Sequence, residues 1–183
     1  MSKEIVVQHN SRKNMLQRYN KERNRNLLAQ PGEHQFILVL DNLKPSFNVG
    51  KIFRSAEAFG AAAVYLVNIG PFDPAPAKGS FRKVPARFFD DFKQAHEQLV
   101  ADGYSLFLLE PDSSRRLTSS ELPNKSAFIF GHEEFGFSFD RSDFPDLQSL
   151  SIPQTGSVQS LNVSIAAAIV MYEYRRQHDS EPT

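Results

Sequence analysis

The most informative part of the sequence is Ile152-Pro153-Gln154-Thr155-Gly156-Ser157-Val158-Gln159-Ser160-Leu161-Asn162-Val163-Ser164, followed directly by Ile165-Ala166-Ala167-Ala168-Ile169. This order of residues predicts the end of a buried strand, then a polar loop, then a helix that begins near residues 157–160. Pro153 suits a strand exit because it cannot donate a hydrogen bond to a sheet ladder. A loop so rich in hydroxyl and amide groups either binds an anion or polar ligand or simply caps the helix. One helical stripe is apolar, and we expect it to pack into the core: Leu161, Ile165, Ile169 and Tyr172.

The length and composition are typical of one cytoplasmic α/β domain. A chain of 183 residues can bury a substantial core but is too short for two full domains. It contains no cysteine, which excludes disulfides and thiolate chemistry, and its five histidines lack ligand-like spacing, so we expect no metal. No apolar run approaches the roughly 18 residues of a membrane span, and no signal-peptide pattern is present. We therefore expect a cytoplasmic protein with no membrane partner.

Charge is distributed unevenly along the chain. The formal net charge is zero, yet residues 1–30 contain seven Lys or Arg against two Glu, a net +5 that the remainder balances. This asymmetry predicts a basic N-terminal arm at 1–30, a compact domain at 31–178 and a frayed tail at 179–183. The apolar spacing in the arm fits one short amphipathic helix. The arm is either a solvated terminus or a segment that contacts nucleic acid.

Apolar strands alternate with amphipathic helices through the domain. Such an alternation predicts an α/β fold with a mostly parallel sheet flanked by helices. The loop at 68–83 carries three basic residues and is long enough to be functional or mobile, or simply solvated. We expect strands at 36–40, 64–67, 104–109, 127–131 and 148–152, and helices at 49–59 and 91–102 before the last one.

Three polar loops follow three of these strands, at 48–54, 131–136 and 152–162. The carboxyl edge of a parallel sheet is where ligands bind, so the three loops predict one shared site. We expect Asn48 at the N-cap of its helix, Arg54 projecting from the first turns, and Glu133 accepting loop N–H groups or holding Arg54. Capping, a surface arginine and a solvated glutamate would equally explain these residues. The glycine fingerprints of dinucleotide-binding and P-loop proteins are missing.

Together the three loops resemble motifs 1, 2 and 3 of the SPOUT superfamily, in its TrmH/SpoU branch of RNA 2′-O-ribose methyltransferases. The similar segments lie at 40–60, 130–136 and 152–168, within a match over roughly residues 34–178. The resemblance implies a C-terminal trefoil knot that binds S-adenosyl-L-methionine, and a homodimer whose active site draws on both subunits. It also implies catalytic roles for Arg54, Asn48, Glu133, Ser160 and Asn162, and cofactor contacts, mostly through the backbone, at Leu109, Gly131, Ile152 and Leu161.

The implied reaction moves a methyl cation from a sulfonium to a ribose hydroxyl, which is a weak nucleophile. The family commonly assigns the arginine matching Arg54 as the base. A guanidinium keeps its proton up to a pH of about 12, so we assign Arg54 to phosphate binding or to stabilising the developing alkoxide, and to base action only if the bound substrate changes its environment. Ser160 could hold the phosphate, while Asn48, Asn162 and Glu133 fix the geometry of the loops.

The substrate is less closely defined by the sequence. The run at 157–164 is most similar to tRNA guanosine enzymes, so we favour tRNA over rRNA. A noncatalytic RNA-binding relative would be indicated by loss of Arg54, Glu133 or Asn162, and all three are present. A nucleotide-dependent oxidoreductase would need the missing glycine fingerprint. Phe135 and Phe137 make the second motif more aromatic than the family pattern, which affects how a substrate fits.

Overall fold

The structure is a computed structural model that describes residues 3–179, with side chains described from residue 12 onward. Apart from Asp179, the predicted frayed tail at 179–183 therefore lies outside the described residues. Asp179 itself caps the last helix, because its N–H donates to the Arg175 carbonyl at 2.7 Å and its carboxylate lies 2.7 Å from the Arg175 Nε.

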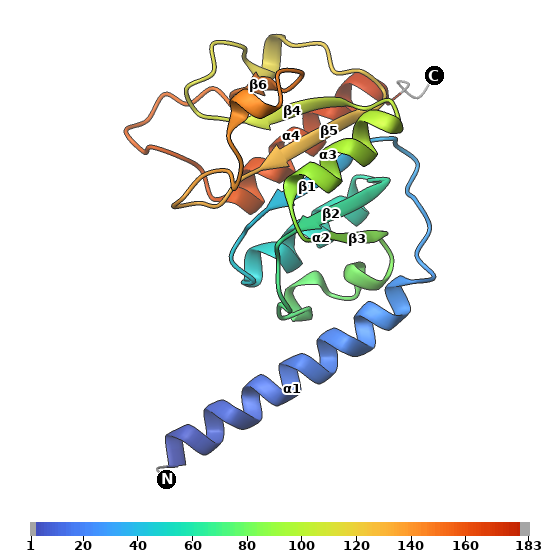
Figure 1. The fold of residues 1–183 in the computed structure, drawn as a ribbon, viewed down its shortest axis with the longest axis vertical. Coiled ribbons are helices and arrows are strands. Elements are labelled where there is room, and N and C mark those ends of the chain that lie inside the picture. The colour runs from blue at the N-terminus through green and yellow to red at the C-terminus, as the bar shows by residue number, and fades with distance from the viewer. Residues whose placement is uncertain (1–2, 180–183) are drawn as a thin grey trace.

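Six strands in this part of the chain form one sheet, in the order β3-β2-β1-β5-β4-β6 (Figure 1). Every neighbouring pair is parallel, which confirms the predicted α/β architecture. Continuous apolar runs form the central strands because both of their faces are covered. The strands are β1 (Ile37–Asp41), β2 (Ala63–Val67), β3 (Ala86–Phe89), β4 (Ser105–Leu109), β5 (Ser126–Phe130) and β6 (Gln148–Leu150).

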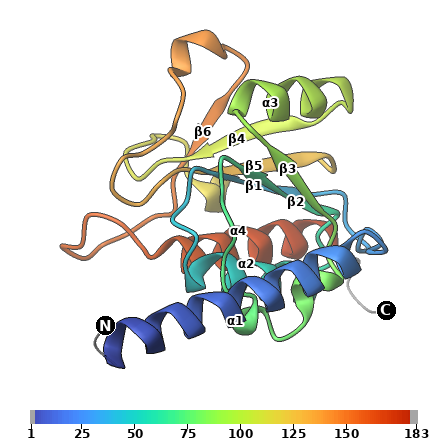
Figure 2. The ribbon, with the colours of Figure 1, turned by 60° about the horizontal axis from the view of Figure 1, so that its bottom comes forward.

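Helices cover both faces of the sheet, as Figure 2 shows. Leu38 and Leu40 of β1 face the core under α2 and α4, whereas Ile37 and Val39 face the core under α3. This alternation follows from the two-residue period of a strand. None of the helices between residues 3 and 179 combines the length and apolar character that a membrane span requires. The helices are α1 (Lys3–Asn26), α2 (Phe47–Ala58), α3 (Phe92–Ala101) and α4 (Val163–His178).

One strand, β3, was not expected from the sequence. It is an edge strand of four residues that pairs only with β2 among the described strands, and its side chains are mostly half-exposed. A short strand of this kind lacks the continuous apolar run that marks a buried strand. The segment before it, expected as a loop, contains two short 3-10 helices, η1 (Ala75–Ala77) and η2 (Ser80–Arg82).

The start and the buried face of α4 both differ from the prediction. The helix begins at Val163, not near 157–160, because the Asn162 side chain caps it by accepting from the Ser164 N–H at 3.0 Å. The predicted core stripe was wrong: Leu161 precedes the helix, and the other three members face outward. Their exposed fractions are Ile165 53%, Ile169 36% and Tyr172 62%. The face that packs into the core instead holds Val163, Ala167, Val170, Met171 and Tyr174.

The basic arm forms a helix of 24 residues, longer than the short helix expected. The second half of α1 lies against η2, and its first half extends beyond the sheet domain (Figure 1). Tyr19 is buried, with its ring 5.3 Å from Phe72 and 5.8 Å from Phe81. The Asn26 Nδ2 donates to the carbonyls of Phe81 and Val84, so the end of the arm is a fixed part of the domain.

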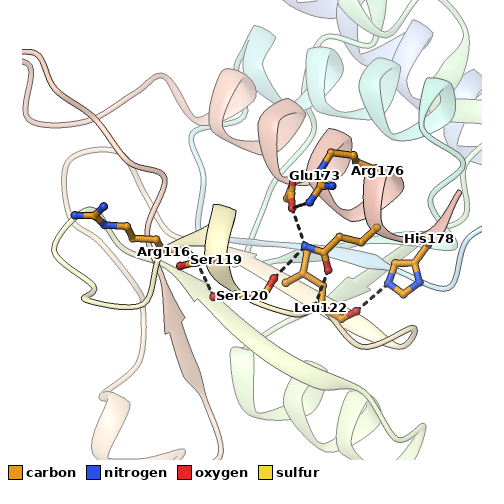
Figure 3. Close-up of polar contacts among 8 residues, drawn as sticks. Arg116, Ser119, Ser120, Leu122, Glu173, Arg176 and His178 are labelled. Atoms are coloured by element: carbon orange, nitrogen blue, oxygen red, sulfur yellow. Dashed lines mark hydrogen bonds and ion pairs between the residues drawn. The ribbon is translucent and has the colours of Figure 1, made fainter.

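The end of α4 is joined to the segment that follows β4 (Figure 3). Gln177 Nε2 donates to the Ser120 carbonyl at 3.0 Å, and Gln177 Oε1 accepts from the Leu122 N–H at 2.9 Å. Nearby, Arg176 donates two hydrogen bonds of 2.8 Å to Glu173. The hydrogen bond from Arg176 lowers the pKa of Glu173 below its usual range, against the opposing effect of burial.

Candidate active site

A cavity of about 740 Å³ opens at the carboxyl ends of β4, β5 and β6. Leu109, Phe130 and Leu150, the last residues of these strands, all line it. The loops after the strands complete the wall, as expected for a parallel sheet. Glu133 and Ser160, from the predicted catalytic set, lie in the cavity wall. The wall also contains all four residues predicted to contact a cofactor: Leu109, Gly131, Ile152 and Leu161.

A chain of hydrogen bonds joins the three sequence motifs beside this cavity. Asn48 Nδ2 donates to Glu133 Oε1 at 2.8 Å, and Asn162 Nδ2 donates to Asn48 Oδ1 at 3.3 Å. Asn162 Oδ1 accepts from the N–H and hydroxyl of Ser164, which orients the amide so that its Nδ2 faces Asn48. The structure thus brings together three predicted catalytic residues, one from each motif.

The position of Asn48 differs from the prediction. Ser46, and not Asn48, is the N-cap of α2, and its hydroxyl accepts from the Asn48 N–H at 3.4 Å. Asn48 lies in the first turn, where its side chain is free to reach the neighbouring motif. A capping role therefore does not explain this residue.

Arg54 is not brought into the cavity by its own chain. It is exposed on α2, and no described residue forms a hydrogen bond or ion pair with it. Within one chain Glu133 does not hold Arg54, since its carboxylate accepts from Asn48 instead. A guanidinium that no described side chain neutralises remains available to a phosphate or another anion.

The second motif forms a tight hairpin between His132 and Gly136. The His132 N–H donates to the Gly136 carbonyl at 2.7 Å, and the Gly136 N–H donates back at 2.9 Å. His132 Nδ1 also accepts from the N–H groups of Glu134 and Phe135, so its proton is on Nε2. A Cβ on Gly131 would lie 2.8 Å from the Gly136 backbone, so a side chain there requires the hairpin to move.

Asp41 lies behind the cavity wall and has a supporting role that the sequence analysis did not assign. It is fully buried at the end of β1, where its carboxylate accepts from the N–H of Ser138 at 2.6 Å and from its hydroxyl at 2.7 Å. Burial raises the pKa of Asp41 above its usual value, and the two hydrogen bonds oppose this effect. Asp41 thus holds the loop after β5 to β1. An aspartate that ends an apolar strand was the available signal.

Two further acidic residues line the cavity and were also missed: Glu110 and Asp112. Glu110 follows β4 directly and accepts hydrogen bonds from Ser149 and, at 3.2 Å, from Arg141. Carboxylates in such a wall can accept hydrogen bonds from hydroxyl or amino groups of a ligand. Among the described residues, no group of three or more His, Cys, Asp or Glu is placed to hold a metal.

Solved structures share the fold of this chain. An AdoMet-bound rRNA methyltransferase from Sinorhizobium meliloti superposes with a TM-score of 0.70 at 22% sequence identity, covering 85% of this chain and 61% of that one. This likeness defines the fold class, an α/β protein with a parallel sheet flanked by helices. More narrowly, the chain belongs to the SpoU rRNA methylase family, whose model matches residues 35–172. The resemblance seen in the sequence is therefore confirmed.

Two curated relatives differ in the RNA that their names specify. The 23S rRNA (guanosine-2′-O-)-methyltransferase RlmB of Nitrosomonas europaea is 32% identical over 157 residues, which are 83% of this chain and 60% of the relative. The tRNA (guanosine(18)-2′-O)-methyltransferase of Thermus thermophilus is 30% identical over 146 residues, which are 76% of this chain and 74% of the relative. The chain thus spans about 60% of the length of the first of these proteins.

Proposed function

We propose that the protein transfers a methyl group from S-adenosyl-L-methionine to a ribose 2′-hydroxyl of RNA. The observation that supports this most strongly is the cavity at the sheet edge, whose wall contains the four predicted cofactor residues. Beside it, hydrogen bonds join one residue of each family motif. Family membership and two relatives named as 2′-O-methyltransferases point to the same reaction.

The cavity fits the cofactor in size and chemistry. Its volume of about 740 Å³ lies in the range of pockets that hold ligands of this size. The wall combines apolar side chains such as Leu161 with Glu110 and Asp112, which suit a molecule that has an adenine, a ribose and an amino acid part. Gly131 lies in this wall, and the lack of a side chain there lets the hairpin close against it, since a Cβ would lie 2.8 Å from the Gly136 backbone. The bound cofactor would supply an electrophilic methyl group on a sulfonium sulfur.

The protein's own residues then have distinct tasks. Arg54 binds the phosphate next to the target ribose or stabilises the developing alkoxide, because a guanidinium offers fixed donors and a permanent charge. Ser160, in the cavity wall, donates a hydrogen bond to the same phosphate. Asn48, Asn162 and Glu133 hold the three loops in register through their hydrogen bonds.

We infer that two copies form the working enzyme. The outward face of α4 carries the exposed side chains of Ile165, Ile169 and Tyr172, an apolar stripe that a second copy would cover. Tyr172 also contacts α2, with its ring 6.4 Å from that of Phe59, so this face adjoins the helix that bears Arg54. Since Arg54 lies outside the cavity of its own chain, the cavity of the other copy is where it would act.

Mixing two inactive variants tests the shared site. Arg54→Ala removes the guanidinium, and Gly131→Ala damages the cavity, so each homodimer should be inactive. Mixed dimers would hold one intact site, and the mixture should regain about a quarter of the wild-type rate, since half of random dimers are mixed. No recovery after subunit exchange would refute sharing.

Ile169→Asp should halve the mass in sedimentation, whereas Val100→Asp, on the exposed part of α3, should not.

We favour tRNA as the substrate, with rRNA as the alternative that the Nitrosomonas europaea relative supports. The tRNA preference draws on the motif 3 loop and on the Thermus thermophilus relative.

The fixed arm adds phosphate contacts through its exposed basic residues. Replacing Arg12, Lys13 and Arg18 by Gln keeps the buried anchors and should flatten the dependence of log Kd on log salt by about 2–3. An unchanged slope would exclude the arm from RNA binding.

The trefoil knot is part of the proposal. Ser151 pairs with the segment after β4, since it accepts from the Leu117 N–H at 2.8 Å and donates to the Arg115 carbonyl at 2.9 Å. The end of α4 then bonds to residues 120 and 122 of the same segment. These contacts support a chain end that is threaded past this loop. A cytoplasmic location follows from the proposed RNA substrate.

The decisive experiment is transfer of labelled methyl groups from S-adenosyl-L-methionine to bulk tRNA and to rRNA, followed by nucleoside mapping. A 2′-O-methylnucleoside in one pool establishes both the reaction and the substrate class. Cofactor binding measured by calorimetry separates the failures. Binding without transfer to either pool contradicts both favoured substrates, and no binding at all favours a noncatalytic RNA-binding protein.

A further inference from the structure

Phe135 stands on the outer side of the cavity rim. The residues before it, Gly131, His132 and Glu133, line the cavity, and so does Gly136 after it, but Glu134 and Phe135 do not. The Phe135 side chain is 73% exposed. The hairpin therefore leaves one large aromatic ring exposed to solvent, outside the wall of the proposed cofactor cavity.

The exposed ring is held in place by its own hairpin. Its centroid lies 4.7 Å from the imidazole of His132, and the Phe135 N–H donates to His132 Nδ1 at 3.3 Å. The paired backbones of His132 and Gly136 close the turn. Burial of a large apolar ring stabilises a protein, so an exposed ring is unfavourable unless a partner covers it. The contacts of the hairpin keep the Phe135 ring in this exposed position.

The surroundings of Phe135 combine aromatic and basic groups. Phe47, the first residue of α2, is 62% exposed and adjoins Asn48, which bonds to the same hairpin. Lys44 reaches the hairpin as well, with its Nζ 3.3 Å from the Glu134 carboxylate. Lys51 and Arg54 are exposed on the next turns of α2. Proteins that bind unpaired RNA place aromatic rings for base stacking beside basic groups for the phosphates in this way.

We propose that Phe135 stacks on an unpaired nucleobase of the RNA substrate, at or next to the nucleotide whose ribose is methylated. This inference rests on the proposed function and adds a residue that determines specificity. A phenyl ring has no hydrogen-bonding group, so it selects for a base that is free to leave its helix and not for base identity. Because Phe135 lies on the same hairpin as Glu133, a base stacked on its ring would lie beside the proposed cofactor cavity.

Substitutions at this position separate stacking from plain apolar contact. Loss of one stacked base is worth about 1–3 kcal/mol, so Phe135→Leu should raise the KM for RNA roughly 5- to 150-fold while cofactor affinity stays the same. Phe135→Tyr should restore the wild-type KM. Val100→Leu, at an exposed apolar position on α3, is the control. If the leucine and tyrosine variants have the same KM, an aromatic ring is not required and the proposal is overturned. If the leucine variant instead has a lower mass in sedimentation, Phe135 serves a protein interface, which also overturns the proposal.

A fluorescence titration tests stacking without turnover. The chain contains no tryptophan, so Phe135→Trp introduces a single indole, and Val100→Trp gives a matched control. Saturation with tRNA or rRNA should quench the first by at least half and leave the second nearly unchanged. Quenching by tRNA or rRNA when neither pool receives a methyl group would refute the proposed function but support stacking. No quenching by an RNA that the wild type methylates, or no RNA binding at all, would overturn the stacking proposal.

Discussion

Replacing Asn26 by alanine should loosen the N-terminal helix from the domain. Asn26 is 7% exposed, and its amide makes three hydrogen bonds to the segment around η2 and β3. Nδ2 donates to the carbonyls of Phe81 and Val84, and Oδ1 accepts from the Ala86 N–H at 3.0 Å. Each bond contributes about 0.5–1.5 kcal/mol, and buried partners left unsatisfied add to the loss, so the free energy of unfolding should fall by about 2–4 kcal/mol.

Urea unfolding measures this loss, with Asn24→Ala as the control. Asn24 lies half a turn earlier on α1 and is exposed, so its replacement should change the free energy of unfolding by less than about 0.5 kcal/mol. The Asn26 variant should lower the urea midpoint by on the order of 1–2 M. Trypsin should also cleave within α1 sooner. If the two variants unfold at the same urea concentration, the amide does not anchor the arm and the reasoning is wrong.

Three further predictions concern the site and the end of α4. Arg54→Ala should lower methyl transfer at least about a hundredfold with cofactor binding intact, while Lys51→Ala on the same helix should not. Calorimetry should show that Gly131→Ala weakens cofactor binding, because its Cβ would collide with the hairpin, whereas Gly156→Ala meets nothing within 4 Å and should bind normally. Because its pKa is lowered in the folded protein, Glu173 contributes stabilisation at neutral pH that is lost as the pH falls through the acidic range in which this carboxylate takes up a proton. Glu173→Gln should therefore narrow the difference between urea midpoints at pH 7 and pH 3.

The strands of the central sheet could be predicted because burial on both faces leaves a clear mark in the sequence. β1 and β5 are runs of apolar residues that end in a polar loop, and the observed bounds lie within about one residue of those expected. The edge strand β3 carries no such mark. Its order Ala-Arg-Phe-Phe neither alternates nor stays apolar, and only pairing with β2 makes it a strand.

The buried face of α4 could not be predicted from periodicity, because the helix has two apolar stripes. One runs through Ile165 and Ile169, and the other runs through Ala167, Val170 and Tyr174. Each has helical spacing, and the sequence does not say which stripe meets the sheet. The stripe that includes Tyr174 packs into the core. The exposed stripe, which the periodicity assigns to the core equally well, is the face that we propose a second copy covers.

The relation between the site and the helix caps was also outside the reach of the sequence. Motif spacing placed Asn48, Glu133 and Asn162 near one another, but it could not show which atoms meet. In the structure Ser46 caps α2, which leaves the Asn48 amide free, whereas Asn162 uses its Oδ1 to cap α4. That bond turns the Asn162 Nδ2 toward Asn48, whose own Nδ2 then faces Glu133. The hydrogen bond that starts α4 therefore also sets the direction of the whole chain of amides, and a substitution that shifted this cap would misalign all three motifs at once.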